Sequence, residues 1–239
     1  MSVVTPSPVE IKVACSGAFR AAYLELLPGF ERGTGHKVTT EWGGSIGTAP
    51  TTIPSRLQRG EPFDLVILSG DSLDRLIAAG RVASGSRVDL ARSGIGVAVR
   101  AGASKPDISS TDALKQALLN ARSIAHSSSA SGVYVAALLQ RLGIAGDTER
   151  RVKRIEGEPV GRVIARGEAE IGFQQVSELL PVAGIDYVGP LPSEVQEVTV
   201  FAAGIPMGAV RPDAARTLVE YLTAPAASAT ISRCGMEPA

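Results

Sequence analysis

The chain has 239 residues, of which 44% are hydrophobic, so it can bury a large core in one large domain or in two smaller ones. Its 24 basic and 24 acidic side chains give a formal net charge of zero, which argues against nucleic acid or an anionic membrane surface as the partner. Its apolar stretches are far shorter than the roughly 20 residues that span a bilayer, so we expect no membrane insertion.

The first ten residues, MSVVTPSPVE, lack the basic region and the apolar region of a secretory signal. We therefore expect a cytoplasmic protein from the sequence as given, and a periplasmic one if the chain is a mature or trimmed form. Cys15 and Cys234 have no second cysteine or histidine at metal-ligand spacing. We predict two unbridged thiols, no metal site and no cofactor.

Segments with the length and composition of strands alternate with segments of helical periodicity. This order is typical of α/β proteins with largely parallel sheets, and most of the strands are apolar throughout, as expected when both faces are covered. The eight expected strands lie at residues 11–15, 36–42, 63–69, 95–100, 123–127, 170–173, 185–189 and 198–205.

Three helices can be predicted individually. The first follows Ser16, and Pro28 is expected to kink or end it. The second follows Ser131 and is expected to end before Gly143, a residue type that tolerates the left-handed helix exit. The third is expected over residues 212–224, with a proline at its start and another just after its end.

Small hydrogen-bond donors follow three of the expected strands. Ser16 and Gly17 follow the first strand, Gly43 to Ser45 follow the second, and the sequence SSSASG follows the strand at 123–127. The first N–H groups of a helix attract anions, and ligands of open parallel sheets lie beyond the carboxyl ends of the strands. For each serine taken alone, helix capping is the plainer interpretation. Their recurrence favours one shared anion pocket.

Residues 43–47 match the G-x-S-x-G pattern of serine hydrolases, and Asp64 and His126 follow in the order found in those enzymes. Pro50 and Pro54, however, interrupt the helix that should follow the nucleophile directly. The oxyanion loop of that fold is also missing from the preceding chain. The sequence therefore disfavours a hydrolase.

Few titratable side chains are candidates for the pocket. His126 adjoins the serine cluster and is a candidate general base, although a structural role is the alternative. Arg162 could offer a bidentate fork to a carboxylate or lie on a solvated helix face. Gln174 and Gln175 follow a strand and could donate amide hydrogens to the same pocket.

Several stretches in the same order resemble the molybdate-binding branch of the type II periplasmic solute-binding proteins. They are SGAFRAAYLELLPGFERGTGHKVTTEW, RLQRGEPFDLVILSGDSLDRLIAAGRV, GVYVAALLQRLG and IARGEAEIGF. The resemblance implies a two-lobed α/β fold in which each lobe is a mostly parallel sheet flanked by helices, with two crossing strands as the hinge. It places the first lobe at residues 1–97 plus 198–239 and the second at 98–197.

The resemblance also implies a small anion held in the cleft between the lobes. The ligand-binding candidates, from the residues and the resemblance together, are Ser16, Gly17, Ser45, Ser128, Ser131, Gly132, Val160, Arg162, Gln174 and Gln175. A fourth ligand loop is expected near Glu158 to Val160. Closure of the lobes would complete the donor shell and exclude water, which strengthens each hydrogen bond to the ligand.

The sequence departs from the molybdate-binding branch at one expected tyrosine, where it has Gln175, and after Ser45, where its loop is longer. These features are similar to a subgroup that includes aconitate isomerase, which moves a double bond in a tricarboxylate. Two functions therefore stay open. One is a receptor for an oxyanion such as molybdate or for an organic carboxylate, a monomer that supplies an ABC permease. The other is an isomerase. A ligand-sensing regulator is disfavoured because no DNA-binding helix pair is evident.

Overall fold

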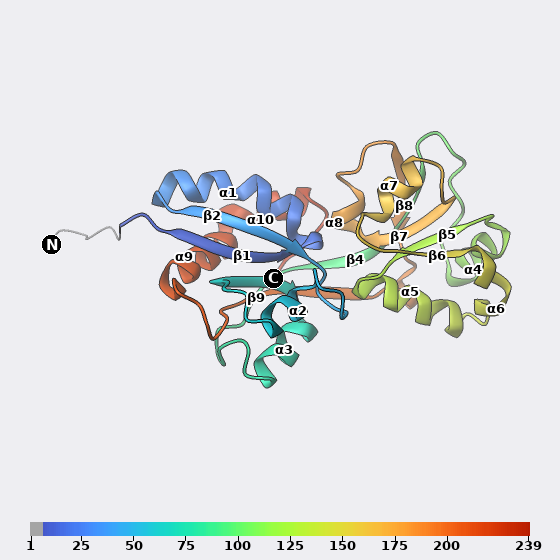
Figure 1. Cartoon of the computed structure of the whole chain (residues 1–239). Coiled ribbons are helices and arrows are strands. Elements are labelled where there is room, and N and C mark those ends of the chain that lie inside the picture. The colour runs from blue at the N-terminus through green and yellow to red at the C-terminus, as the bar shows by residue number, and fades with distance from the viewer. Residues whose placement is uncertain (1–6) are drawn as a thin grey trace. The chain divides into compact units, whose positions relative to one another are not determined.

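The computed structural model describes residues 7–239, which form two compact units (Figure 1). Unit 1 contains the described part of residues 1–91 together with Val200–Arg233 and Pro238–Ala239. Unit 2 contains Arg92–Thr199 and Cys234–Glu237. Each unit has a sheet flanked by helices, which confirms the predicted two-lobed α/β class.

Unit 1 is built on the sheet order β2-β1-β3-β9, in which β1 is parallel to both β2 and β3, and β9 is antiparallel to β3. Its elements are β1 (Glu10–Ser16), η1 (Gly17–Phe19), α1 (Arg20–Thr34), β2 (Lys37–Gly43), α2 (Ile53–Gln58), β3 (Leu65–Ser69), α3 (Gly70–Ala78), β9 (Val198–Gly204), α9 (Pro212–Thr223), α10 (Pro225–Arg233) and β10 (Glu237–Pro238).

Helices cover both faces of this sheet (Figure 1). Val66 and Leu68 of β3 pack with Leu73 of α3 and Ile53 of α2 in one apolar cluster. On the other face, α1, α9 and α10 pack against one another. Strand β3 is buried along its whole length, which explains why its sequence is apolar rather than alternating.

Helix α1 does not end at Pro28, which was one of the two effects expected of this proline. The helix continues through the proline to Thr34 and ends at Gly35, which has the left-handed φ of 76°. Buried Tyr23, Leu26 and Phe30 lie on its inner face. The packing of that face offsets the loss of the one hydrogen bond that a proline nitrogen cannot donate.

Unit 2 is built on the sheet order β4-β7-β5-β6, and β8 also pairs with β4. Strands β5, β6 and β7 are parallel to one another, whereas β4 is antiparallel to β7 and β8. The elements are β4 (Val88–Arg100), α4 (Thr111–Asn120), β5 (Ile124–Ser127), α5 (Ala130–Arg141), α6 (Ala145–Thr148), η2 (Glu149–Arg151), β6 (Val152–Ile155), α7 (Val160–Ala165), β7 (Ile171–Gln175), α8 (Val176–Leu179), β8 (Ile185–Pro190) and η3 (Ser193–Val195).

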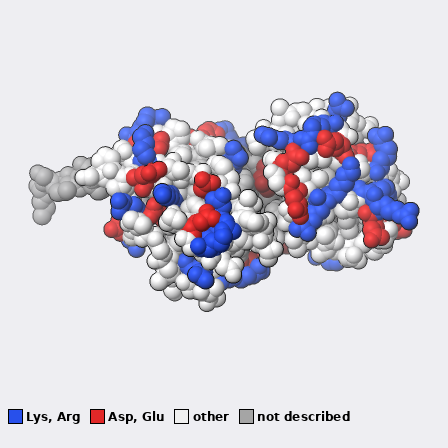
Figure 2. Space-filling view, in the orientation of Figure 1, with Lys and Arg blue, Asp and Glu red and all other residues white. Residues whose placement is uncertain are grey.

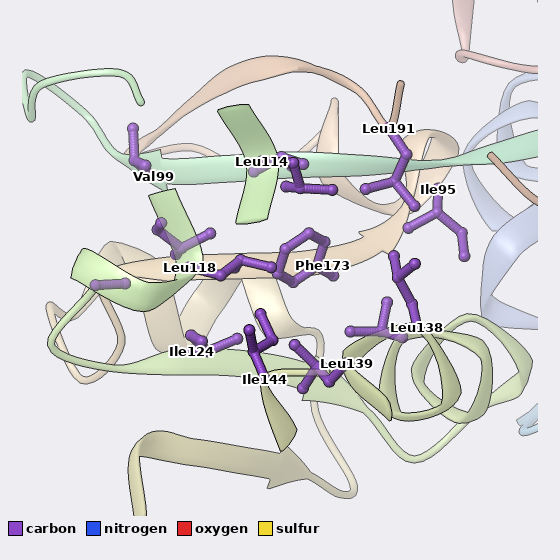
Figure 3. Packing of buried hydrophobic residues seen from close by; sticks show 14 residues of the cluster. Ile95, Val99, Leu114, Leu118, Ile124, Leu138, Leu139, Ile144, Phe173 and Leu191 are labelled. Atoms are coloured by element: carbon purple, nitrogen blue, oxygen red, sulfur yellow. The ribbon is translucent and has the colours of Figure 1, made fainter. Parts of the chain in front are cut away.

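The larger core of unit 2 lies between its sheet and helices α4 and α5 (Figure 3). Phe173 of β7 is fully buried there, with Leu118 of α4 and Leu138 of α5 around it. On the opposite face, Val160 and Ile164 of α7 pack in a second cluster. Both faces of the sheet are therefore covered.

Strands β4, β9 and β10 each contain residues of both units, and in β10 the change falls between Glu237 and Pro238. Ala91 of β4 belongs to unit 1 and Arg92 to unit 2, and in β9 the change falls between Thr199 and Val200. All eight expected strands form, and the third helix, α9, runs from Pro212 to Thr223. The second expected helix, α5, begins slightly earlier than Ser131.

Acidic and basic side chains are interspersed over the face shown in Figure 2, in keeping with the zero formal charge. No helix within residues 7–239 is long and apolar enough to cross a membrane. In the same residues, no group of three or more His, Cys, Asp or Glu side chains is placed to hold a metal ion.

Candidate functional site

The parallel strands of unit 1 bring three serines to one edge of its sheet. Ser16 is the last residue of β1, Ser69 is the last residue of β3, and Ser45 follows the end of β2. All three are almost fully buried. The Ser69 N–H donates to Ser45 Oγ at 3.0 Å, and Ser45 Oγ donates to Ser16 Oγ at 3.1 Å. We call Ser16, Ser45 and Ser69 donor set 1.

The direction of these hydrogen bonds determines what donor set 1 can bind. Because the hydroxyl hydrogen of Ser45 is used on Ser16, the hydroxyl of Ser16 keeps its own hydrogen for an acceptor beyond the strand end. Ser16 also precedes the first turn of η1, and its side chain makes no capping hydrogen bond. Donor set 1 therefore presents a hydroxyl donor and helix-terminal N–H groups, which suit an anion.

Ser69 is the member of donor set 1 that the sequence prediction missed. It occupies the same position after β3 that Ser16 occupies after β1, at the junction with a helix. The rule of small donors at strand ends, applied to the sequence LVILSG, would have identified it. Its contribution to the set is a backbone N–H, which any residue type other than proline could supply.

The hydrolase pattern does not form a nucleophile elbow. Helix α2 begins only at Ile53, and a loop in which Gly47 has a positive φ of 100° separates it from Ser45. The expected acid, Asp64, accepts hydrogen bonds from three backbone N–H groups. It therefore has a structural role, as the sequence already suggested by disfavouring a hydrolase.

In unit 2, a second group of hydroxyls lies between β5 and α5. Ser127 Oγ is 2.7 Å from Ser129 Oγ and 3.1 Å from Ser131 Oγ, and the last two oxygens are 3.5 Å apart. Ser129 is the N-cap residue of α5, yet its side chain makes no capping hydrogen bond. The three hydroxyls bond one another rather than the helix backbone. We call Ser127, Ser129 and Ser131 donor set 2.

Gly132 and Ser128 fix the conformation of this turn, the first by close packing and the second by a backbone hydrogen bond. A Cβ on Gly132 would lie 1.5 Å from the carbonyl oxygen of Ser127, so the glycine is required by the chain's own packing. The expectation that Gly132 lets a ligand approach the backbone closely stays a prediction, and the close approach seen in this structure is that of the Ser127 carbonyl. The Ser128 N–H donates to the carbonyl of Ile155 at 2.9 Å, which ties the turn to β6.

His126 is buried beside donor set 2, and its Nδ1 lies 2.9 Å from the carbonyl oxygen of Ser127. A carbonyl only accepts, so Nδ1 carries the hydrogen and donates it. Nε2 then carries the lone pair, and the role of His126 as a base stays a prediction. The Nδ1 bond holds the imidazole against the start of the serine turn.

Val160 and Gln174 are brought together by the tertiary structure. The Val160 N–H, at the first residue of α7, donates to Gln174 Oε1 at 2.8 Å. Both side chains are buried. In this structure the backbone donor expected for a ligand is bonded to the protein, so the ligand-binding role of Val160 stays a prediction.

Gln175 is fully buried, and its amide is directed at two of the strands that belong to both units. In the orientation that satisfies its neighbours, its nitrogen donates to the carbonyls of Ser93 at 2.9 Å and Gly94 at 3.0 Å, and its oxygen accepts from Thr199 Oγ1 at 3.0 Å. The side chain thus joins β7 to β4 and β9. Its role as a ligand donor stays a prediction.

The remaining candidates lie on the loop before α7 and on that helix. Glu158 forms a bidentate ion pair with Arg166 at 2.8 and 2.9 Å, and this pairing lowers the pKa of Glu158. Arg162 is exposed on α7, which matches the solvated helix face that the sequence left open as its alternative.

The neighbouring helix α8 contains an ionisable group that the sequence prediction missed. Glu178 interacts with the side-chain amide of Gln174, and burial raises its pKa to about 7. A pattern of four residues, VSEL, gives no indication of this environment, because burial of the carboxyl depends on segments distant in the sequence.

Residues 11–237 match the family model described as bacterial extracellular solute-binding protein. The chain is 44% identical to an aconitate isomerase from Pseudomonas sp. over 229 residues, covering 95% of this chain and 87% of that protein. It is 30% identical over 238 residues to the molybdate-binding protein ModA of Azotobacter vinelandii, covering 95% and 89% of the two chains.

Among solved structures, the periplasmic molybdate-binding protein of Azotobacter vinelandii superposes with a TM-score of 0.77 at 23% identity, over 95% of this chain and 98% of that one. The predicted resemblance is thereby confirmed at the level of fold and family. The chain has the type II periplasmic binding protein fold and belongs to the bacterial extracellular solute-binding protein family.

Proposed function

We propose that this chain binds a small organic anion with more than one carboxylate, and that donor sets 1 and 2 serve the same ligand. The observation that carries the proposal is the pair of buried hydroxyl groups, one at the carboxyl edge of each sheet. Neutral donors held by one another are arranged before the ligand arrives, which limits the cost of ordering them. Exclusion of water strengthens their bonds to a charged guest.

Two observations favour a carboxylate over a tetrahedral oxyanion. Identity to the aconitate isomerase is 44%, against 30% to the molybdate-binding protein. The side-chain amides of Gln174 and Gln175 are also bonded within the protein. Gln174 accepts from the Val160 N–H, and Gln175 bonds β4 and β9. A small, closely fitted ring of donors around a tetrahedral anion would therefore lack the Val160 N–H and the Gln175 amide. A longer polycarboxylate can instead bind the separate hydroxyls of donor sets 1 and 2.

Binding is tested first by a thermal-shift panel of molybdate, tungstate, sulfate, citrate, cis-aconitate and trans-aconitate. We expect a raised melting temperature with the tricarboxylates, because a ligand that binds only the folded state stabilises it. Stabilisation only by molybdate, tungstate or sulfate would overturn the carboxylate assignment.

The claim that both donor sets serve one ligand is tested by calorimetry on Ser45→Ala and Ser131→Ala. Each variant is expected to bind the tricarboxylate roughly 10- to 100-fold more weakly. Ser131→Ala removes a hydroxyl of donor set 2, and Ser45→Ala removes the partner that leaves the Ser16 hydroxyl hydrogen directed at the ligand. Ser84→Ala and Ser193→Ala replace exposed serines outside the two edges and serve as controls. Full affinity in either Ser45→Ala or Ser131→Ala would show that the sets do not share the ligand.

Double-bond migration in a tricarboxylate is the second candidate function, and the 44% identity to an aconitate isomerase favours it. Such a reaction needs a base that removes a proton next to a carboxylate, an acid that returns it, and donors for the enolate-like charge that develops. The serine hydroxyls would supply those donors. Ultraviolet absorbance and proton NMR of cis- or trans-aconitate incubated with the protein measure turnover directly.

A chain that binds the anion without turning it over would instead deliver it to an ABC permease from the periplasm, the role that its family implies. Tight binding with a flat absorbance trace would favour this receptor function. Interconversion of the two aconitates at a rate proportional to protein concentration would favour the isomerase.

A further inference from the structure

Glu178 lies at the same edge of the unit 2 sheet as donor set 2. Strands β5 and β7 are parallel, with His126 opposite Phe173. The next residues of the two strands, Ser127 and Gln174, therefore lie side by side near the carboxyl ends of β5 and β7. Helix α8 follows β7 directly and carries Glu178 on its single turn.

Glu178 is connected through Gln174 to the start of α7. The amide of Gln174 interacts with the Glu178 carboxyl, while its oxygen accepts from the Val160 N–H at 2.8 Å. Gln174 is 4% exposed, so its amide is held between these two groups. Glu178 as a whole residue is only partly buried, whereas its carboxyl is buried deeply enough to raise its pKa.

The acid–base properties of Glu178 suit proton transfer near neutral pH. Burial raises its pKa to about 7, and the Gln174 interaction acts in the opposite direction. A group with this pKa populates its acid and base forms to similar extents near neutral pH, which favours general acid–base catalysis. The ionisable groups on segments packed around α8 include Arg162 on α7, Asp186 and Tyr187 on β8, and Cys234 and Glu237 near the carboxyl terminus, whereas β7 has none.

Two other ionisable candidates lie at this edge. Glu158 is paired with Arg166, and His126 donates its Nδ1 hydrogen to Ser127, which leaves Nε2 as its basic nitrogen. Glu178 is thus the carboxyl at this edge whose observed partner is a neutral amide rather than a cation.

We propose that Glu178 is the proton-transfer residue of the isomerase, an inference that rests on the second candidate function. Its carboxylate takes a proton from the methylene carbon next to a substrate carboxylate. The electron pair of the broken C–H bond forms the new C=C bond, and the pair of the old C=C bond takes the proton back from Glu178 at the far carbon. One C–H bond breaks, one forms, the double bond moves, and no oxidation or reduction occurs.

The test compares Glu178→Gln and Glu178→Asp with wild type and with Glu194→Gln, which alters an exposed glutamate of the same unit. Turnover is followed by ultraviolet absorbance, solvent deuterium incorporation by NMR, and affinity by calorimetry. We expect Glu178→Gln to lose about 100- to 10,000-fold in kcat, with affinity within a few-fold of wild type. Glu194→Gln should match wild type, and Glu178→Asp should retain part of the activity with a shifted pH profile.

Two results would overturn the proposal, and they differ. If wild type neither interconverts the aconitates nor exchanges deuterium, the isomerase function fails and the role of Glu178 fails with it. If wild type turns over and Glu178→Gln does so within a few-fold, only the assignment of Glu178 is wrong. Should Glu178→Gln fold poorly, Glu178→Asp decides, because shortening the side chain by one methylene must lower kcat and shift its pH profile relative to wild type and Glu194→Gln.

Discussion

At the scale of single residues, Gly132 determines the geometry of donor set 2. Its Cα faces the carbonyl of Ser127, which also accepts from His126, so one backbone oxygen organises both the imidazole and the helix start. A side chain at position 132 would have to displace this carbonyl. The serine hydroxyls around it would then lose the spacing that lets them bond one another.

Gly132→Ala is therefore expected to destabilise the protein at or beyond the upper end of the roughly 1–3 kcal/mol typical of overpacking. The measurement is urea unfolding. Gly33→Ala is the control, because Gly33 lies in helix α1 with open space around its Cα, and alanine there should stabilise by up to about 1 kcal/mol. Equal stability of Gly132→Ala and wild type would contradict the packing described for this turn.

The raised pKa of Glu178 predicts that the stability of the protein depends on pH. Its pKa rises from the usual 4.5 to about 7 on folding. Between these values the folded protein keeps a proton that the unfolded chain has lost, so the free energy of unfolding falls as the pH rises from about 4.5 to 7. Above pH 7 the free-energy cost of holding the ionised Glu178 carboxylate in its buried position is complete and no longer changes with pH.

Glu178→Gln removes this titration. Relative to wild type, the variant is expected to gain roughly 1–3 kcal/mol between pH 4.5 and pH 8, a range that allows for the partial exposure of the residue as a whole. Denaturant unfolding at several pH values measures the difference, with Glu194→Gln as the control. A difference between Glu178→Gln and wild type that does not change with pH would exclude the raised pKa.

At the scale of elements, one buried carboxylate joins β1 to the segment that leads into α9. Asp64 accepts from the Lys12 N–H at 2.9 Å, from Val210 at 2.8 Å and from Arg211 at 2.7 Å. These contacts join segments far apart in the sequence at the end of the sheet where β1 begins. The sequence motif had suggested a catalytic acid at this position, whereas the structure gives it a role in folding.

Asp64→Ala is expected to lower the free energy of unfolding by roughly 3 kcal/mol, because it leaves buried N–H groups without an acceptor. Asp64→Asn keeps one oxygen and should cost less. Thermal and urea unfolding measure both effects. If Asp64→Ala were as stable as wild type, these N–H groups would not depend on the carboxylate.

Elements also differ in how well the sequence predicts them. Strand β3 is buried at every position and reads as an apolar run, whereas the short strand β6, VKRI, is half-exposed and charged and was not predicted. Strand β6 forms because β5 offers it a parallel partner in register, Ile124 opposite Val152. A pairing partner is information that a four-residue window does not contain.

At the scale of the whole molecule, the repeated arrangement is the informative feature. Each unit has parallel strands that end in hydroxyl-bearing residues, and each set is linked by hydrogen bonds within its own unit. Fold alone does not separate a receptor from an isomerase, because the same scaffold hosts both kinds of protein. The separation depends on whether a proton-transfer group accompanies the donors.

The sequence by itself determined the α/β class, the eight predicted strands and the candidate serines Ser16, Ser45 and Ser131. Periodicity, apolar runs and small residues at strand ends are local properties, so a local pattern records them. The tertiary structure alone decided that Ser69 joins donor set 1, that Gln174 bonds Val160, that Gln175 bonds β4 and β9, and that Glu178 is buried. Each of these depends on register and packing between segments distant in sequence, which set hydrogen-bond distances and burial.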